Sequence, residues 1–355
     1  MKKRLLVALA ITTAAAGLTA VSASASTARH TANSAVCVLL PDSKSSVRWE
    51  TQDRRYLAAA FKAAGVSSTI VNAEGDAQKQ RSQADQCLTN GAKVILLVNL
   101  DSGSGAAIEK AAAAKGAKTI DYDRLTLKGS ASYYVSFDNV AVGVLEGKGV
   151  VDALTASGML AKKPVIAYLN GSPTDNNATL FKQGYASIID PLFKSGKAVK
   201  GPDQSVPGWD NQKARTIFDQ MLVSTSNKID AVDAANDGLG NAVITALQAK
   251  KLKPIPVSGQ DATAQGVQNV LAGWQSGTVY KGVKQEAEAA AALAIALIKG
   301  TTATANGKVN DGVRDVPSVL LVPVWVTKAN YKVLFTEGFL KKSDVCNGMY
   351  AKYCK

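Results

Sequence analysis

The sequence predicts two α/β lobes, each built on a doubly wound parallel sheet with helices on both faces. Short apolar segments without polar alternation recur from Val36 onward, which is typical of strands buried in parallel sheets. Segments with helical periodicity lie between them, for example 51–65 and 76–91, and they begin at acidic or hydroxyl residues and end at Gly. The alternation runs through two consecutive series, which indicates two lobes.

The first series contains the expected strands Val36–Leu40, Ser68–Val71, Val94–Val98, Thr119–Tyr122 and Tyr133–Ser136. The second series contains Val165–Leu169, Ala198–Gly201, Ile229–Ala234, Pro256–Gly259 and Val279–Lys281. We therefore expect an N-terminal lobe of residues 36–140 with 282–316. The C-terminal lobe would comprise 141–281 with 317–345, followed by a cysteine-bearing tail, 346–355.

The first 25 residues have the pattern of a signal peptide. The basic start "MKKR" precedes an uncharged apolar stretch, 5–20, and small residues follow with a cleavage site after Ala25. The apolar stretch is too short and too rich in Ala and Thr for a membrane span, and no cysteine directly follows it to carry a lipid. Residues 26–35 are expected to be a flexible segment. We expect an exported, soluble protein, extracellular or periplasmic, or associated with the cell surface.

Export makes the four cysteines candidates for disulfides. Cys346 and Cys354 lie close together with Gly348 between them, so a local disulfide is expected there. In a sheet with strand order 2-1-3, the helix joining strands two and three passes over strand one, which places Cys87 near Cys37. A Cys37–Cys87 disulfide and two buried free thiols both fit this placement.

Composition excludes several classes of function. The formal net charge is +13, but the basic residues are scattered, which indicates a solvated basic surface and no nucleic-acid partner. The single histidine, His30, precedes the expected fold, which removes Ser-His-Asp catalysis and most zinc sites. No Walker A or GxGxxG pattern is present. We expect no cofactor, no metal site and no catalytic residue.

Polar side chains follow nearly every expected strand, as in "KTIDYDRL", where Asp123 and Arg124 come directly after a buried strand. Ligands of open α/β sheets bind beyond the carboxyl ends of the strands. The groups there are Asp, Asn, Arg, Lys and Trp, which can pair with sugar hydroxyls and stack on a pyranose ring. The pattern predicts a non-enzymatic protein that closes a cleft between its lobes around a small polyhydroxylated ligand.

The motifs "VRWETQDR", "YDR", "YVSFDN", "GSPTDNNATLF", "GWD", "NKIDAV", "AND", "SGQDA" and "TVYK" occur in this order. Over Val36 to Asp344 the chain thereby resembles the type I periplasmic sugar-binding proteins of ABC importers, in particular the D-xylose-binding proteins. The resemblance implies a multi-strand hinge, a monosaccharide ligand such as D-xylose, delivery to an ABC permease, and a monomer. It also implies these sugar-contacting residues: Arg48, Trp49, Asp123, Arg124, Asp175, Asn177, Trp209, Asn236, Asp261 and Lys281.

Several of these residues also have a structural interpretation. Asp123 and Arg124 can form an ion pair at a strand end, and 175–177 can be a capped loop in which Asn176 caps the following helix. Trp209 can be a packed loop aromatic, Trp49 can pack at the start of a helix, and Lys281 can pair with a carboxylate at the hinge. Alternative functions are sugar sensing for a chemoreceptor or sensor kinase, and binding of a different pentose or hexose. An extracellular carbohydrate enzyme using a carboxylate pair such as Asp123 and Asp175 is a further alternative.

Overall fold

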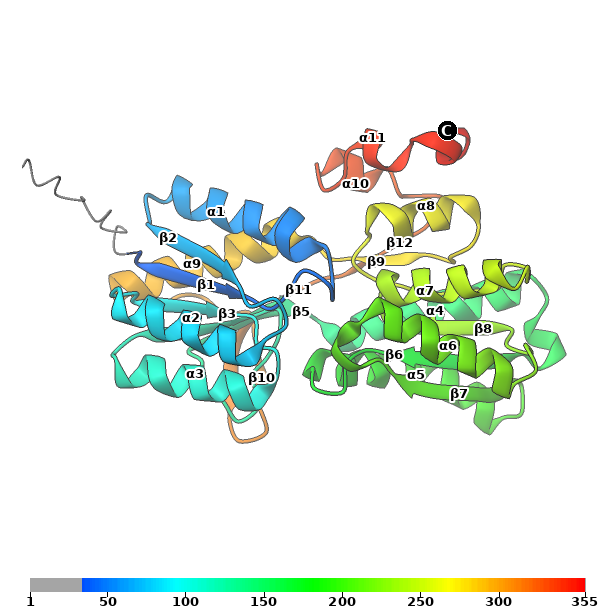
Figure 1. Ribbon diagram of the computed structural model, residues 1–355, viewed down its shortest axis with the longest axis horizontal. Coiled ribbons are helices and arrows are strands. Elements are labelled where there is room, and N and C mark those ends of the chain that lie inside the picture. The colour runs from blue at the N-terminus through cyan, green and yellow to red at the C-terminus, as the bar shows by residue number, and fades with distance from the viewer. Residues whose placement is uncertain (1–33, 355) are drawn as a thin grey trace, which may run out of the picture. The chain divides into compact units, whose positions relative to one another are not determined.

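A computed structural model describes residues 34–354 (Figure 1). The expected signal peptide, its cleavage site after Ala25, and His30 lie outside the described residues, as does most of the segment 26–35. The described residues all belong to one compact unit. Within 34–354 we find no helix that combines the length and the apolar character needed to cross a bilayer.

The first lobe is built on a seven-stranded sheet with strand order β10-β11-β5-β4-β3-β1-β2. Neighbouring strands run parallel except β10, which is antiparallel to β11. The strands are β1 (Val36–Leu40), β2 (Ser68–Asn72), β3 (Val94–Leu97), β4 (Lys118–Tyr122), β5 (Tyr133–Phe137), β10 (Gly307–Asn310) and β11 (Asp315–Leu321). The neighbours β2, β1 and β3 confirm the expected 2-1-3 order.

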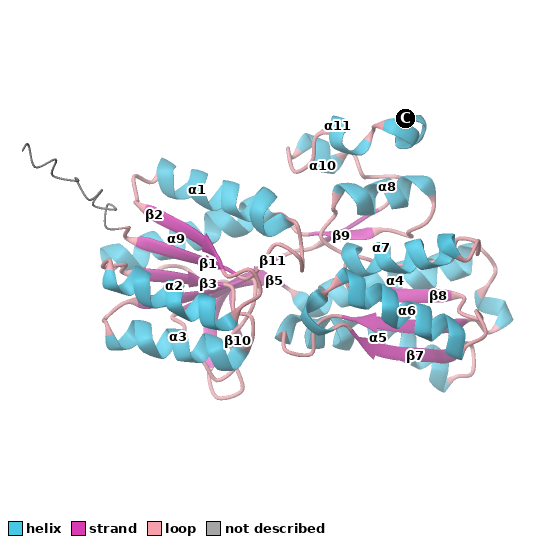
Figure 2. Cartoon of the chain, viewed as in Figure 1, coloured by secondary structure: helices cyan, strands magenta, loops and turns pink. Residues whose placement is uncertain are grey.

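Helices cover both faces of this sheet (Figure 2). Alternate residues of β1 point to opposite faces, so Val38 packs with α1 and α9, whereas Cys37 packs with α2 and α3. The helices are α1 (Arg54–Ala63), α2 (Ala77–Thr89), α3 (Ser102–Ala114) and α9 (Val283–Lys299), with a π-helical turn, Trp49–Asp53, before α1. The Asp76 side chain caps α2 by accepting from the backbone N–H groups of Gln78 and Lys79.

The second lobe has a parallel sheet in the order β7-β6-β8 and a separate antiparallel pair, β12-β9. The strands are β6 (Val165–Asn170), β7 (Val199–Ser205), β8 (Ala231–Ala234), β9 (Thr278–Tyr280) and β12 (Val324–Val326). The α-helices are α4 (Asn139–Ala156), α5 (Asn176–Lys194), α6 (Asn211–Ser224), α7 (Asp237–Ala249) and α8 (Ala264–Ala272). Short 3₁₀ turns occupy Leu160–Lys162 and Pro207–Trp209. One large apolar cluster fills this lobe.

The chain passes between the two lobes after β5, after β9 and after β11. The last crossing differs from the expected boundary between 316 and 317, which falls inside a strand. β11 continues to Leu321 because Ser318 to Leu321 pair with Tyr134 to Phe137 of β5. The chain therefore returns to the C-terminal lobe only after Leu321.

Several expected strands differ in extent. The segment Pro256–Gly259 forms no strand and makes only an isolated parallel bridge between Val257 and Val232. β7 extends to Ser205, well beyond the expected end at Gly201. No strand was expected at β10, β11 or β12, because β10 and β12 have only 4 and 3 residues and Pro317 and Ser318 interrupt the apolar pattern of β11.

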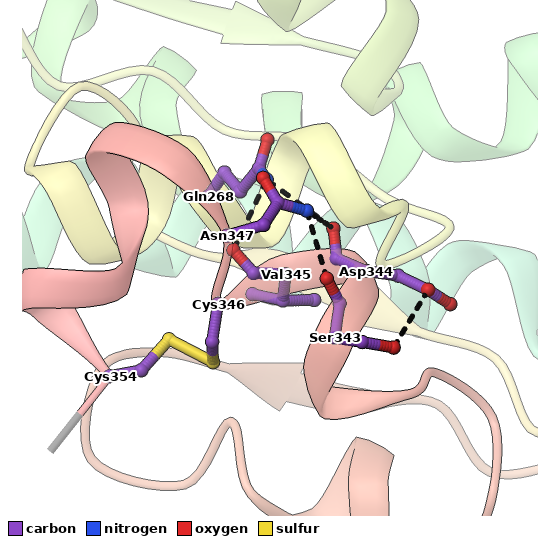
Figure 3. The surroundings of a disulfide bond; sticks show 7 residues. All are labelled: Gln268, Ser343, Asp344, Val345, Cys346, Asn347 and Cys354. Carbon is purple, nitrogen blue, oxygen red and sulfur yellow. Dashed lines mark hydrogen bonds between the residues drawn. A yellow bond between two sulfur atoms is a disulfide. The ribbon is translucent and has the colours of Figure 1, made fainter.

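The C-terminal segment contacts both lobes. It contains α10 (Val333–Thr336), α11 (Lys342–Val345) and the 3₁₀ turn Gly348–Tyr353, and it packs beside α8 (Figure 1). Gln268 of α8 donates to the carbonyl of Val345, while Gln52 of the first lobe donates to the carbonyl of Phe339 at 2.9 Å. Figure 3 shows how the Cys346–Cys354 disulfide closes the end of this segment next to Gln268.

A second disulfide joins Cys37 of β1 to Cys87 of α2, with the Cα atoms 6.1 Å apart. This distance lies within the ordinary range for a disulfide. The crosslink fastens α2 to the centre of the first sheet, and both cysteines are buried. The structure thus contains the bonded alternative and not the two free thiols.

We predict that replacing both Cys37 and Cys87 by Ala destabilises the protein more than replacing both Cys346 and Cys354. The two crosslinks span 50 and 8 positions. Because a longer closed loop restricts the unfolded chain more, the chain-entropy relation gives losses of about 4 and about 2.5 kcal/mol in the free energy of unfolding. Guanidinium unfolding followed by circular dichroism measures both. Equal losses, or free thiols at Cys37 and Cys87 in non-reduced peptides, would contradict the expectation.

Candidate functional site

One cavity receives side chains from both lobes. It is lined by Ser45, Ser46, Arg48, Trp49, Asp123, Arg124, Asp175, Asn177, Phe181, Trp209, Asn236, Gln260, Asp261 and Lys281. Every sugar-contacting residue expected from the sequence is in this set. Ser45, Ser46, Phe181 and Gln260 were not expected. We call the cavity the interlobe cleft.

Strand topology explains the convergence. Asp123 and Arg124 immediately follow β4, Asn236 follows β8 after one residue, and Lys281 immediately follows β9. The parallel strands of one sheet have their carboxyl ends along one edge, which places the residues after β4 and after β8 at the sheet edges, whereas β9 brings Lys281 in from the separate antiparallel pair. The cleft is therefore formed where the strand ends of both lobes face each other.

Arg48 is paired with three carboxylates of the first lobe. Its Nη1 donates to Asp123 at 2.9 Å, its Nε and Nη2 donate to Asp53 at 2.9 and 2.8 Å, and Nη2 also donates to Glu286 at 2.6 Å. Burial acts to lower the pKa of Arg48. The attraction of Asp53, Asp123 and Glu286 outweighs this effect, so the pKa of Arg48 lies well above its ordinary value. The guanidinium is thus held charged and in a fixed orientation.

Two of these carboxylates lie outside the cleft lining. Asp53 also accepts a hydrogen bond from the Tyr122 hydroxyl at 2.7 Å, and Glu286 comes from α9. Burial raises the pKa of Glu286 above its ordinary value, because the attraction of Arg48 offsets this effect only in part and repulsion from Asp123 and Asp53 adds to it. Neither Asp53 nor Glu286 was predicted from the sequence, because both lie in helical segments and not at strand ends.

Asp123 lies between the cations of the cleft. Its carboxylate pairs with Arg48 and lies 3.7 Å from Lys281 Nζ. Burial acts to raise the pKa of Asp123, but Lys281, Arg48 and Arg124 together hold it below its ordinary value. Asp123 is therefore a charged acceptor at neutral pH.

Lys281 forms the second cationic centre. Its Nζ lies 3.1 Å from Asp261 Oδ1, and its pKa is raised because the attraction of Asp261 and Asp123 exceeds the opposing effect of burial. The expected pairing of Lys281 with a carboxylate at the hinge is therefore present, and the same side chain lines the cleft.

Direct contacts join the two lobes across the cleft. Arg124 Nε lies 3.0 Å from Asp175 Oδ2, and Asn177 Nδ2 donates to the carbonyl of Asp123 at 2.9 Å. Asn236 Nδ2 donates to the carbonyl of Ser45 at 3.3 Å. The free volume at the centre is about 30 Å³, which holds about two water molecules. The polar side chains thus satisfy one another in this conformation.

The aromatic residues lie at opposite walls. Trp49 packs in the core of the first lobe, with the guanidinium carbons of Arg48 and Arg124 4.6 and 5.5 Å from its ring centre. Trp209 packs in the second lobe and donates from Nε1 to Asp175 at 3.1 Å. Gly171 is required beside it, because a Cβ there would overlap the Trp209 ring. Both indoles are packed and line the cleft.

Three cleft residues have left-handed backbone conformations. The φ angles are +62° at Asp123, +55° at Trp209 and +87° at Asp261. Such angles are uncommon for residues other than glycine and concentrate at binding sites, where surrounding contacts hold them. At Asp123 the holding contacts are hydrogen bonds from Tyr134 and Ser136 to its carbonyl.

The helix cap differs from the expectation. Asp175, not Asn176, is the N-cap of α5, since its Oδ1 accepts from the backbone N–H of Asn177 at 2.9 Å. Asn176 is the first residue of the helix. One carboxylate therefore caps α5, holds Trp209 and pairs with Arg124. Phe181 lies four residues after Asn177 on the same helix face, and this spacing is a signal that could have identified it.

The chain matches the model of the periplasmic binding protein domain over residues 36–302. It is 34% identical over 300 residues to the D-xylose-binding periplasmic protein of Escherichia coli (strain K12), covering 84% of this chain and 88% of that protein. It is also 34% identical to the multiple sugar-binding periplasmic receptor of Rhizobium radiobacter, covering 85% and 89%.

Among solved structures, an ABC transporter solute-binding protein from Clostridium phytofermentans with bound β-D-glucose is similar. Its TM-score is 0.81 and its identity 30%, covering 87% of this chain and 99% of that one. The chain therefore belongs to the family of periplasmic sugar-binding proteins of ABC transporters, whose type I fold it has. Members of this family bind substrates for sugar transport and are not enzymes.

We predict that Glu286→Gln changes how stability depends on pH. Because the pKa of Glu286 is raised in the folded state, its contribution is present below the ordinary glutamate pKa and is lost as pH rises toward the raised value. The free energy of unfolding of the wild type should therefore fall relative to that of Glu286→Gln between pH 5 and pH 8. Urea unfolding at both values measures this difference. A difference that stays constant or reverses would contradict it.

Proposed function

We propose that this protein captures a monosaccharide, with D-xylose as the preferred ligand, in the interlobe cleft and delivers it to the permease of an ABC importer. The convergence of the predicted sugar-contacting residues from both lobes at one cavity carries the proposal. Their chemistry suits a neutral polyol. Charged acceptors such as Asp123 take hydroxyl protons, and donors such as Arg124 and Asn177 reach hydroxyl oxygens.

Binding would exchange partners within the cleft. The lobes separate at the hinge, and contacts such as Arg124–Asp175 and Asn177–Asp123 open to admit the ring. Closure then buries the sugar, which is favourable only if its hydroxyls regain full hydrogen bonding. The ion pairs of Arg48 lie within the first lobe and would remain in place during opening and closure.

Affinity in the micromolar range corresponds to about −8 kcal/mol. Charge-assisted hydrogen bonds and the apolar faces of Trp49 and Trp209 can supply this after the cost of ordering the ligand. The indoles lie on opposite lobes, so a ring held between them would contact both only in the closed form. Ligand binding and closure are therefore coupled.

The choice of D-xylose is supported by the Escherichia coli relative, which is named for that sugar. D-glucose is the second candidate, because it is bound in the similar protein from Clostridium phytofermentans. The two sugars share the configuration of their ring hydroxyls, and glucose adds a hydroxymethyl group. Delivery to a permease, action as a monomer and export to the cell surface or periplasm are parts of the same proposal.

We predict the largest stabilisation by D-xylose in a thermal-shift panel of pentoses and hexoses. A ligand that binds only the folded state stabilises it by about 2.7 kcal/mol at a hundred times its Kd. D-xylose should therefore raise Tm by several degrees, with D-glucose next. A larger shift for D-glucose or for another epimer would reassign the ligand, and no shift with any sugar would remove the proposal.

We predict that Arg124→Ala lowers the affinity for the preferred sugar ten-fold or more while the fold is retained. The change removes a cleft donor and leaves Asp175 without its cation from the first lobe. Isothermal titration calorimetry measures the affinity. Arg54→Ala is the control, because Arg54 pairs with Glu50 on a half-exposed helix face outside the cleft, and it should bind like the wild type. Equal affinities in all three proteins would reject Arg124 as a contact.

A further inference from the structure

The buried side-chain nitrogen and oxygen atoms of the described cleft residues have hydrogen-bond or ion-pair partners, with one exception. Among the cleft residues that the structure describes, the Oε1 atom of Gln260 is a buried oxygen with neither a hydrogen bond nor an ion pair. Asp261 Oδ1 also lacks a hydrogen bond, but the ammonium group of Lys281 lies 3.1 Å from it. Gln260 is therefore the cleft residue with an unused acceptor.

The orientation of the Gln260 amide is fixed by its other end. Its Nε2 donates to the main-chain carbonyl of Ala235 at 2.6 Å. A carbonyl oxygen only accepts, so the amide nitrogen must face Ala235 and the amide oxygen must face away from it. The side chain is 2% exposed, which leaves Oε1 no route to bulk water.

The backbone around Gln260 is equally constrained. Its carbonyl accepts from the N–H of Asp237 at 3.0 Å, and the residue forms a parallel bridge with Val279 of β9. Asp261, the next residue, is held by Lys281 at the hinge end of the cleft. Gln260 thus presents a preorganised acceptor beside a residue already expected to contact the ligand.

We propose that Gln260 Oε1 accepts a hydrogen bond from a hydroxyl group of the bound sugar and so selects for ligands that carry this hydroxyl. The inference rests on the proposed function. A buried acceptor without a partner is costly, and the cost disappears when a ligand supplies a donor. The ring oxygen of a sugar has no hydrogen to donate, so the partner must be a hydroxyl. Ligands that lack it leave the acceptor unpaired and bind more weakly.

The test is a cycle between protein variants and ligands. Gln260→Met keeps the length of the side chain and removes the acceptor. We expect it to lower the affinity for D-xylose about ten-fold in calorimetry. With D-xylose derivatives deoxygenated singly at C2, C3 or C4, one derivative should bind wild type and Gln260→Met equally, because each lacks one half of the same contact. If none does, the contact lies with the anomeric hydroxyl, and the 1-deoxy derivative should give the equal pair.

Gln80 offers a matched control. It is also fully buried, its Nε2 donates to the carbonyl of Val98 at 2.8 Å, and its Oε1 likewise has no partner, but it lies in α2 outside the cleft. Gln80→Met should leave the affinity for D-xylose unchanged. An unchanged affinity in a folded Gln260→Met variant would overturn the inference, as would an equal loss with every deoxy derivative.

A measurement on the unaltered protein covers the case in which Gln260→Met does not fold. On addition of D-xylose to ¹³C-labelled protein, the side-chain carbonyl carbon of Gln260 should shift downfield on accepting the hydrogen bond, while that of Gln80 stays in place. No shift at Gln260 with saturating sugar would overturn the inference and leave the proposed function standing. A protein that binds no monosaccharide would remove both.

Discussion

The binding cleft depends on one buried cation. Arg48 contacts Asp53, Asp123 and Glu286, which are separated from it by 5, 75 and 238 positions in the chain. A guanidinium cannot be buried without such partners, and the carboxylates equally require the cation. The pairing therefore fixes the loop after β1, the end of β4 and the start of α9 relative to one another. Asp123, which also lies 3.7 Å from Lys281, is positioned by this arrangement.

Pairing of opposite charges also accounts for the contacts within the cleft in this conformation. Arg124 pairs with Asp175, Lys281 with Asp261, and Asn177 with Asp123, so the polar surfaces of the lobes compensate each other. A sugar in the proposed site would replace these contacts with contacts of its own. The difference between the two sets, not their sum, then sets the affinity. By the same reasoning, a hydrogen bond from a ligand to Gln260 Oε1 would replace no existing contact, because this oxygen has no hydrogen-bond partner in the protein.

Much of this arrangement is readable from the sequence, because the carboxyl ends of parallel strands must meet. Asp123 and Lys281 follow strands directly and Asn236 follows after one residue, and the resemblance to sugar-binding proteins implied all three as contacts. Asp53 and Glu286 were not predicted. They contact Arg48 from helical segments, and local sequence patterns do not indicate that contact. β11 escaped prediction for a similar reason. It is recognisable as a strand only through its pairing with β5, which is separated from it by nearly half the chain. Phe181, by contrast, could have been predicted, because it lies four residues after Asn177 on the same face of α5.

The C-terminal segment has a mechanical consequence. It contacts Gln52 in the first lobe and Gln268 in the second, and Tyr280 beside the hinge donates to Glu337 within it. The segment therefore acts as a tether between the two lobes, and the Cys346–Cys354 disulfide closes a loop at its end. Any rotation that parts the lobes must either detach the tether from one of them or stretch it. In the proposed capture mechanism, the range of lobe opening would therefore depend on residues of the C-terminal segment, which lie outside the cleft.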